Sequence, residues 1–121
     1  MRPHAYVLAV PDLDRSVRYF VDVLGFRPEW RDGDNWQSLM RGEVRVMLGH
    51  CPDAPSPREI GDHSYFAYIL VDDVDALHAE LVGKGATVLH APADRSWGKR
   101  EMGVATPDGH RIMFGQTTAH Q

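Results

Sequence analysis

The chain has 121 residues, of which 43% are hydrophobic and 25% are charged, and its formal net charge is −4 with histidine neutral. This length suits one globular domain, or two half-size modules that share a core. The acidic balance argues against a nucleic-acid binder, which would carry a basic surface, and favours a neutral or cationic small partner. With one cysteine, Cys51, and no long apolar run, we expect a cytoplasmic protein that does not bind membranes.

The first half of the chain predicts one helix set among four strands. We expect strands at residues 4–10, 26–30, 36–40 and 44–48, and a helix at residues 14–24. The helix is expected because its apolar residues recur at i, i+3, i+4 and i+7, namely Val17, Phe20, Val21 and Leu24. Asp12 and Asp14 are candidate N-caps, and Gly25 is the natural stop.

A proline-rich stretch at the midpoint separates the two halves. Residues 51–62 contain three prolines and a glycine and are predicted to be a linker. The first module then covers residues 1–50 and the second covers residues 63–121.

The second half repeats the order of the first. We expect strands at residues 64–71, 86–90, 102–106 and 110–116, with a helix that starts after Asp72-Asp73 and a loop at residues 91–99. The helix carries Val74, Leu77 and Leu81 and ends at Gly83 or Gly85. Pro107-Asp108-Gly109 predicts a tight turn, because proline presets φ and glycine tolerates positive φ.

The two halves also match in sequence. Residues 10–14 parallel residues 71–75, and residues 45–49 parallel residues 111–115. The economical interpretation is an α+β fold of two βαβββ modules that form a curved mixed sheet with a ligand cleft. Each module is too small to bury its own sheet, so the two must pack together or across a homodimer.

Strand alternation assigns side chains to two faces of the sheets. The face under the helices is expected to carry Tyr6, Leu8, Val10, Val46, Leu48, Ala67, Ile69, Val71, Ile112 and Phe114. The opposite face is expected to carry Ala5, Val7, Met47, Phe66, Tyr68 and Met113, and to line a concave side.

Several short motifs together resemble the vicinal oxygen chelate superfamily, the glyoxalase, bleomycin-resistance and extradiol-dioxygenase group. The motifs are Asp12-Leu13-Asp14-Arg15-Ser16, Tyr19-Phe20, Leu24-Gly25-Phe26, Val71-Asp72-Asp73, Trp97-Gly98-Lys99-Arg100 and Pro107-Asp108-Gly109-His110. The resemblance covers nearly the whole chain and implies two βαβββ modules around a cleft, commonly completed in a dimer.

Metal-dependent members of that group place His, Gln or Glu at four inward positions. The resemblance puts these positions at Ala5, Met47, Phe66 and Met113, none of which suits a divalent metal. We therefore expect no metal, no other cofactor and no catalytic residue.

The bleomycin-resistance branch is the more similar one. The resemblance implies that two aromatic side chains stack on a drug's planar rings, and these positions fall on Trp36 and Trp97. The residues expected to contact a ligand are Trp36, Trp97, Arg100, Glu101, Met47, Phe66, Tyr68 and Met113. Plain packing of the tryptophans, and a surface ion pair of Arg100 with Glu101, are the ordinary alternatives.

Two functions from different classes follow from the sequence. The favoured one is a metal-free, dimeric antibiotic-resistance protein that binds and sequesters a planar aromatic small molecule, neutral or cationic, without chemistry. The alternative is a metal-dependent enzyme of the same fold, such as a glyoxalase, lyase or dioxygenase.

Overall fold

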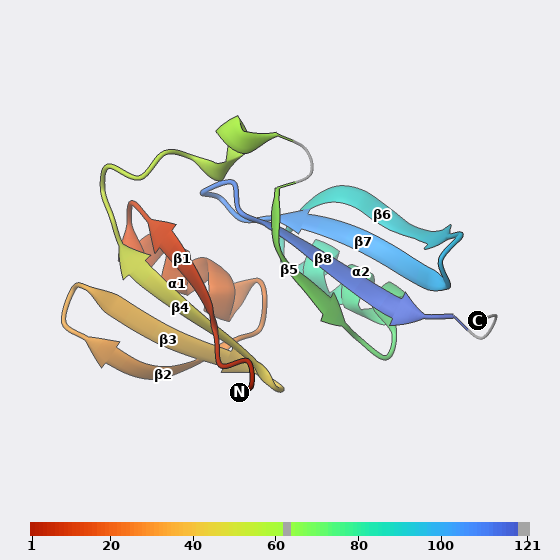
Figure 1. Ribbon diagram of the computed structural model, residues 1–121, viewed down its shortest axis with the longest axis horizontal. Helices are drawn as coiled ribbons and strands as arrows, with labels where there is room; N and C mark the ends of the chain where they lie inside the picture. Colours follow the sequence, from red (N-terminus) through yellow and green to blue (C-terminus); the bar gives the residue numbers. More distant parts are fainter. Residues whose placement is uncertain (62–63, 119–121) are drawn as a thin grey trace.

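The computed structural model describes residues 1–61 and 64–118, so the end of the expected linker and of the second module lie outside the described residues. Figure 1 shows two modules side by side, each a four-stranded sheet with one helix behind it. The strand orders are β1-β4-β3-β2 and β5-β8-β7-β6. In each sheet the first strand runs parallel to the last, and the other neighbours are antiparallel. The predicted α+β fold of two βαβββ modules is confirmed.

The first module follows the predicted order with small shifts at the ends of its elements. Its elements are β1 (Tyr6–Val10), α1 (Leu13–Asp22), β2 (Arg27–Asp32), β3 (Trp36–Arg41) and β4 (Val44–His50). Asp12 is the N-cap of α1, and its carboxylate accepts a hydrogen bond of 3.0 Å from the Arg15 backbone N–H. A short 3₁₀ helix, η1 (Pro57–Ile60), lies in the stretch between the modules.

The second module differs from the prediction in one strand. Its elements are β5 (Tyr65–Leu70), α2 (Val74–Gly83), β6 (Thr87–Arg95), β7 (Lys99–Ala105) and β8 (Arg111–Thr117). The expectation of a loop at residues 91–99 is wrong, because β6 continues to Arg95 and pairs there with Lys99 of β7. The register is irregular between His90 and Ala93, which accommodates Pro92 without a ladder hydrogen bond.

One apolar core joins the two modules. The face under the helices is buried as the alternation predicts: Leu8, Val10, Val46, Leu48, Ala67, Ile112 and Phe114 are each at most 6% exposed. Ile69 and Val71 are partly buried against the same cluster. Tyr6 is the exception at 37% exposed: it lies at the start of β1, and its ring makes a T-shaped contact with the Phe66 ring across the module boundary.

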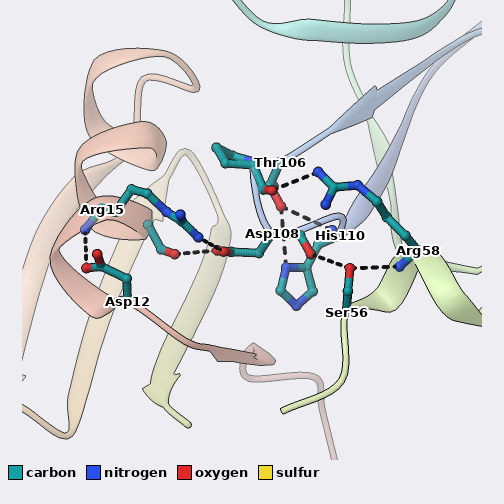
Figure 2. A network of polar contacts seen from close by, with 9 residues as sticks. Asp12, Arg15, Ser56, Arg58, Thr106, Asp108 and His110 are labelled. Atoms are coloured by element: carbon teal, nitrogen blue, oxygen red, sulfur yellow. Dashed lines mark hydrogen bonds and ion pairs between the residues drawn. The ribbon is translucent and has the colours of Figure 1, made fainter. Parts of the chain in front are cut away.

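The Pro107-Asp108-Gly109 turn fastens the second module to α1 and to the linker (Figure 2). The buried Asp108 carboxylate accepts hydrogen bonds from the Arg15 guanidinium and the Ser16 hydroxyl of α1. Its backbone carbonyl accepts from the Ser56 hydroxyl at 3.2 Å. Asp108 therefore links three segments that are far apart in the sequence.

Within residues 1–61 and 64–118, neither helix is long and apolar enough to cross a membrane.

Candidate functional site

The two sheets expose the faces opposite their helices, and both faces point the same way. In Figure 1 both helices lie on the far side of the sheets, so the near side of each sheet is not covered by a helix. We call this side the open face. Several of its side chains are exposed: Val7 is 59% exposed and Tyr68 43% exposed. Most of the residues expected to bind a ligand project from it.

A hydrogen-bonded cluster at the end of the second sheet holds Trp97. Glu101 of β7 is only 4% exposed, and its Oε2 accepts from the Tyr68 hydroxyl at 2.7 Å and from the Trp97 indole N–H at 2.9 Å. The Arg95 guanidinium approaches the other carboxylate oxygen at 3.6 Å. Trp97 is nevertheless 62% exposed. Its polar edge is therefore tied to the sheet while most of the ring stands in solvent.

Two glycines of the second sheet leave room for ring side chains on this face. A Cβ on Gly115, the partner of Glu101 across β7 and β8, would lie 2.6 Å from Cζ of Tyr68. A Cβ on Gly103 would lie 2.7 Å from Nε2 of His90. The Tyr68 and His90 rings thus lie directly over bare backbone, an arrangement that the motifs did not suggest.

Hydrogen bonding and burial keep the Tyr68 hydroxyl protonated. Burial raises the pKa of Tyr68, and the hydrogen bond to Glu101 and its negative charge raise it further. The hydroxyl lies beside Gly115 and Glu101, although the residue as a whole is 43% exposed. Tyr68 is accordingly a hydrogen-bond donor to Glu101 throughout the physiological pH range.

Trp36 lies flat on the first sheet in a related way. It opens β3 opposite Gly49, and a Cβ on Gly49 would come within 2.8 Å of two atoms of the indole ring. Gly49 and Gly115 occupy matching places in the internal repeat. Each module therefore has a ring lying on a glycine of its last strand, and Trp36 is 36% exposed.

The other predicted ligand residues lie in three different places. Met47 and Met113 are partly buried on the open faces, while Phe66 packs at the module boundary, 5.8 Å from the Tyr6 ring and 6.2 Å from the His110 ring. Arg100 does not lie with Glu101: it is paired with Asp75 of α2 at 3.0 Å and with Asp94 at 3.2 Å. Arg100 therefore belongs to the helix side of the sheet.

One chain does not bring the two tryptophans together. Trp36 follows the turn between β2 and β3, and Trp97 lies in the turn between β6 and β7. Figure 1 places these turns at opposite ends of the longest axis of the molecule. A single flat ligand therefore cannot stack on both rings of the same chain.

A second polar cluster occupies the open face of the first sheet. Glu29 accepts from Arg45 at 2.9 Å and from the buried Ser38 hydroxyl at 2.7 Å. The hydrogen bonds from Arg45 and then Ser38 lower the pKa of Glu29. The charges of Glu29 and Arg45 are therefore paired with each other on this face.

The residues at the family's metal positions do not fit a divalent metal. Ala5 and Phe66 have no ligand atom, and Met47 and Met113 offer only soft thioethers. Among the described residues, no group of three or more His, Cys, Asp or Glu side chains lies close enough together to hold a metal ion.

A groove of about 990 Å³ lies elsewhere, between the two modules, beside β5, α2 and the turn that joins β3 to β4. Two of its charged groups, Arg41 and Glu80, are paired with each other at 2.8 Å. A third, Asp73, caps α2. Neither Trp36 nor Trp97 lines this groove, although Tyr68 does.

A family model confirms the relationship that the motifs suggested. The model of the Glyoxalase/Bleomycin resistance protein/Dioxygenase superfamily matches residues 2–114. The chain belongs to this superfamily. An uncharacterized protein of Mycolicibacterium smegmatis is 30% identical over 108 residues, which cover 89% of this chain and 87% of that protein. An uncharacterized protein of Mycobacterium tuberculosis strain H37Rv is 38% identical over 78 residues, which cover 64% of this chain but only 45% of that protein.

Several solved structures have the same fold. TioX from Micromonospora sp. ML1 is 27% identical, with a TM-score of 0.74 over 95% of this chain and 99% of that one. The bleomycin-binding protein of Streptomyces verticillus, solved with copper(II)-bleomycin, is 26% identical, with a TM-score of 0.73 over 100% and 98% of the chains. The bleomycin resistance determinant of transposon Tn5 is 23% identical, with a TM-score of 0.78 over 97% and 98%, and supports the fold alone.

Proposed function

We propose that this protein binds a planar aromatic small molecule, in particular a cationic one, and lowers its free concentration without chemical change. The observation that carries the proposal is Trp97, whose ring is 62% exposed although its N–H is fixed to the buried Glu101. An exposed ring held in one orientation has already lost much of the freedom that binding would remove. Such a ring can stack on a flat ligand at little cost.

We further propose that the site is completed by a second copy of the chain. The turn before Trp36 and the turn that holds Trp97 lie at opposite ends of one chain, so a clamp of two indoles needs Trp36 from one protomer and Trp97 from its partner. The open faces point the same way in each chain, which leaves both available to a partner. The homodimer would hold two equivalent sites, as a two-fold axis requires.

The comparisons support binding of a drug-like molecule. The bleomycin-binding protein of Streptomyces verticillus shares 26% identity with this chain over its full length. The net charge of −4 favours a cationic ligand, with an advantage that fades as salt screens it. The metal-dependent alternative is not proposed, because the four matched positions lack suitable ligand atoms.

The test is a titration with bleomycin and with 9-aminoacridine, a flat cation, followed by tryptophan fluorescence and calorimetry. We expect quenching on binding, and we expect Trp97→Ala to weaken binding about tenfold, because the stacking and cation–π contributions of one ring amount to about 1–2 kcal/mol. Trp30→Ala is the matched control, since Trp30 is 47% exposed and is not one of the two rings proposed to hold the ligand. Equal affinity of the Trp97→Ala variant and the parent would refute the role of Trp97.

A further inference from the structure

We propose that Glu101 is a positioning residue that fixes the Trp97 indole upright and, through its charge, makes that ring select cationic over anionic flat ligands. The inference rests on the proposed function for its ligand, but its first part can be tested on the free protein. It assigns to Glu101 a role behind the ring rather than in contact with the ligand.

The geometry separates Glu101 from the surface that a ligand would touch. The carboxylate is 4% exposed, whereas Trp97, which it holds by the indole N–H, is 62% exposed. The same oxygen accepts from the Tyr68 hydroxyl, so a single atom ties the turn between β6 and β7 to strand β5. Because the N–H is the only polar group of the indole, Trp97 has no donor left for a ligand and can offer only its faces.

The neighbours of Glu101 maintain this arrangement. Tyr68 reaches the carboxylate only because Gly115 leaves the backbone beneath it bare. The raised pKa of Tyr68 keeps its hydroxyl a donor. Arg95 is the cation beside the carboxylate, at 3.6 Å, but its side chain is 36% exposed and is screened by solvent.

The charge of Glu101 bears on the choice of ligand. A hydrogen bond to a negative acceptor polarises the donor, which increases electron density in the indole ring. The attraction of a ring face for a cation is electrostatic and grows with that density. A flat cation should therefore gain from Glu101, and a flat anion should lose.

The first experiment uses free protein in which Trp30→Phe and Trp36→Phe leave Trp97 as the single tryptophan. We expect its time-resolved fluorescence anisotropy to decay with the tumbling of the whole molecule. Glu101→Ala should add a fast component from free rotation of the indole, while Glu59→Ala, at an exposed site on η1, should not. An indole that stays equally immobile in the Glu101→Ala variant would overturn the positioning role.

Two milder variants keep this test decisive if Glu101→Ala does not fold. Tyr68→Phe removes one donor to the carboxylate and should give a smaller fast component. Glu101→Gln keeps an oxygen that can accept both hydrogen bonds and should leave the indole immobile. If Trp97 is as immobile in the Tyr68→Phe variant as in the parent, the hydrogen bond from Tyr68 does not help Glu101 to hold the indole, and this part of the proposal is contradicted.

The second experiment compares 9-aminoacridine with anthracene-9-carboxylate, a cation and an anion of similar three-ring shape, on protein with all three tryptophans. We expect the parent to prefer the cation, and Glu101→Gln to reduce that preference about two- to fivefold. An unchanged preference would overturn the selectivity. If the parent binds neither dye, the selectivity fails together with the proposed function, whereas the positioning role is decided by the anisotropy alone.

Discussion

Replacing Gly49 by alanine tests the contact between the Trp36 ring and the sheet. The new methyl group would lie 2.8 Å from two ring atoms, well inside van der Waals contact, so the indole must leave its place. An aromatic side chain buries about 150–250 Å², and Trp36 is 36% exposed. We expect the displaced ring to lose about a third to a half of the apolar area that it buries in the parent. At roughly 25 cal/mol per Å², this loss costs about 1–2 kcal/mol.

Urea unfolding measures this cost directly. With a slope of about 2 kcal/mol per molar in urea, we expect the midpoint of Gly49→Ala to fall by about 0.5–1 M with the slope unchanged. Trp36 emission should shift to the red as the ring enters water. Gly83→Ala at the end of α2 is the matched control, since nothing lies within 4 Å of the new methyl group, and it should be neutral or stabilising by up to about 1 kcal/mol. An unchanged midpoint and spectrum for Gly49→Ala would refute the close contact between the Trp36 ring and Gly49.

Two further predictions concern the turn that joins the modules. Asp108→Ala should destabilise the protein by about 2–3 kcal/mol in chemical denaturation, because the buried Ser16 hydroxyl loses its acceptor, while the exposed Arg15 limits the charge contribution. A loss below about 0.5 kcal/mol would show that the link is dispensable. Burial lowers the pKa of His110 from 6.5 despite the nearby Asp108 charge, so below about pH 6.5 the unfolded chain takes up a proton that the folded protein resists. Stability should therefore fall between pH 7 and 5.5, less steeply in His110→Gln, and equal slopes in both proteins would contradict the assignment.

Short-range patterns were enough to predict the order of elements. The i, i+3, i+4 spacing of apolar residues located α1, and the aspartates before each helix located the N-caps. Alternation identified the buried face of both sheets, because a residue shifted by one position in a strand points to the opposite side. Tyr6 departs from this pattern because its surroundings are set by the other module.

The strand β6 and the place of Arg100 depended on pairing across the sheet. Residues 91–95 have no apolar alternation of their own and become a strand because β7 provides partners for them. Arg100 and Glu101 are adjacent and so point to opposite faces. The alternation could have separated them, but the motif grouped them together.

The cluster around Trp97 could be predicted only in part. Trp97, Glu101 and Tyr68 were each expected near a ligand, yet the hydrogen bonds among them join β5, β7 and a turn. The contacts between rings and glycines depend on strand register. Gly115 matters because it lies opposite Glu101 and beneath the Tyr68 ring. Single-sequence patterns carry no information on such contacts between strands.

Mixing two defective variants tests most directly whether the site is shared between two chains. In the proposed homodimer, the Trp36→Ala variant and the Trp97→Ala variant should each bind 9-aminoacridine weakly at both sites. A mixed dimer has one site that lacks both rings and one site that has Trp36 from one protomer and Trp97 from its partner. We therefore expect unfolding and refolding the two variants together to restore parental affinity at one site in each mixed dimer. A mixture that binds no better than the separate variants would contradict the shared clamp.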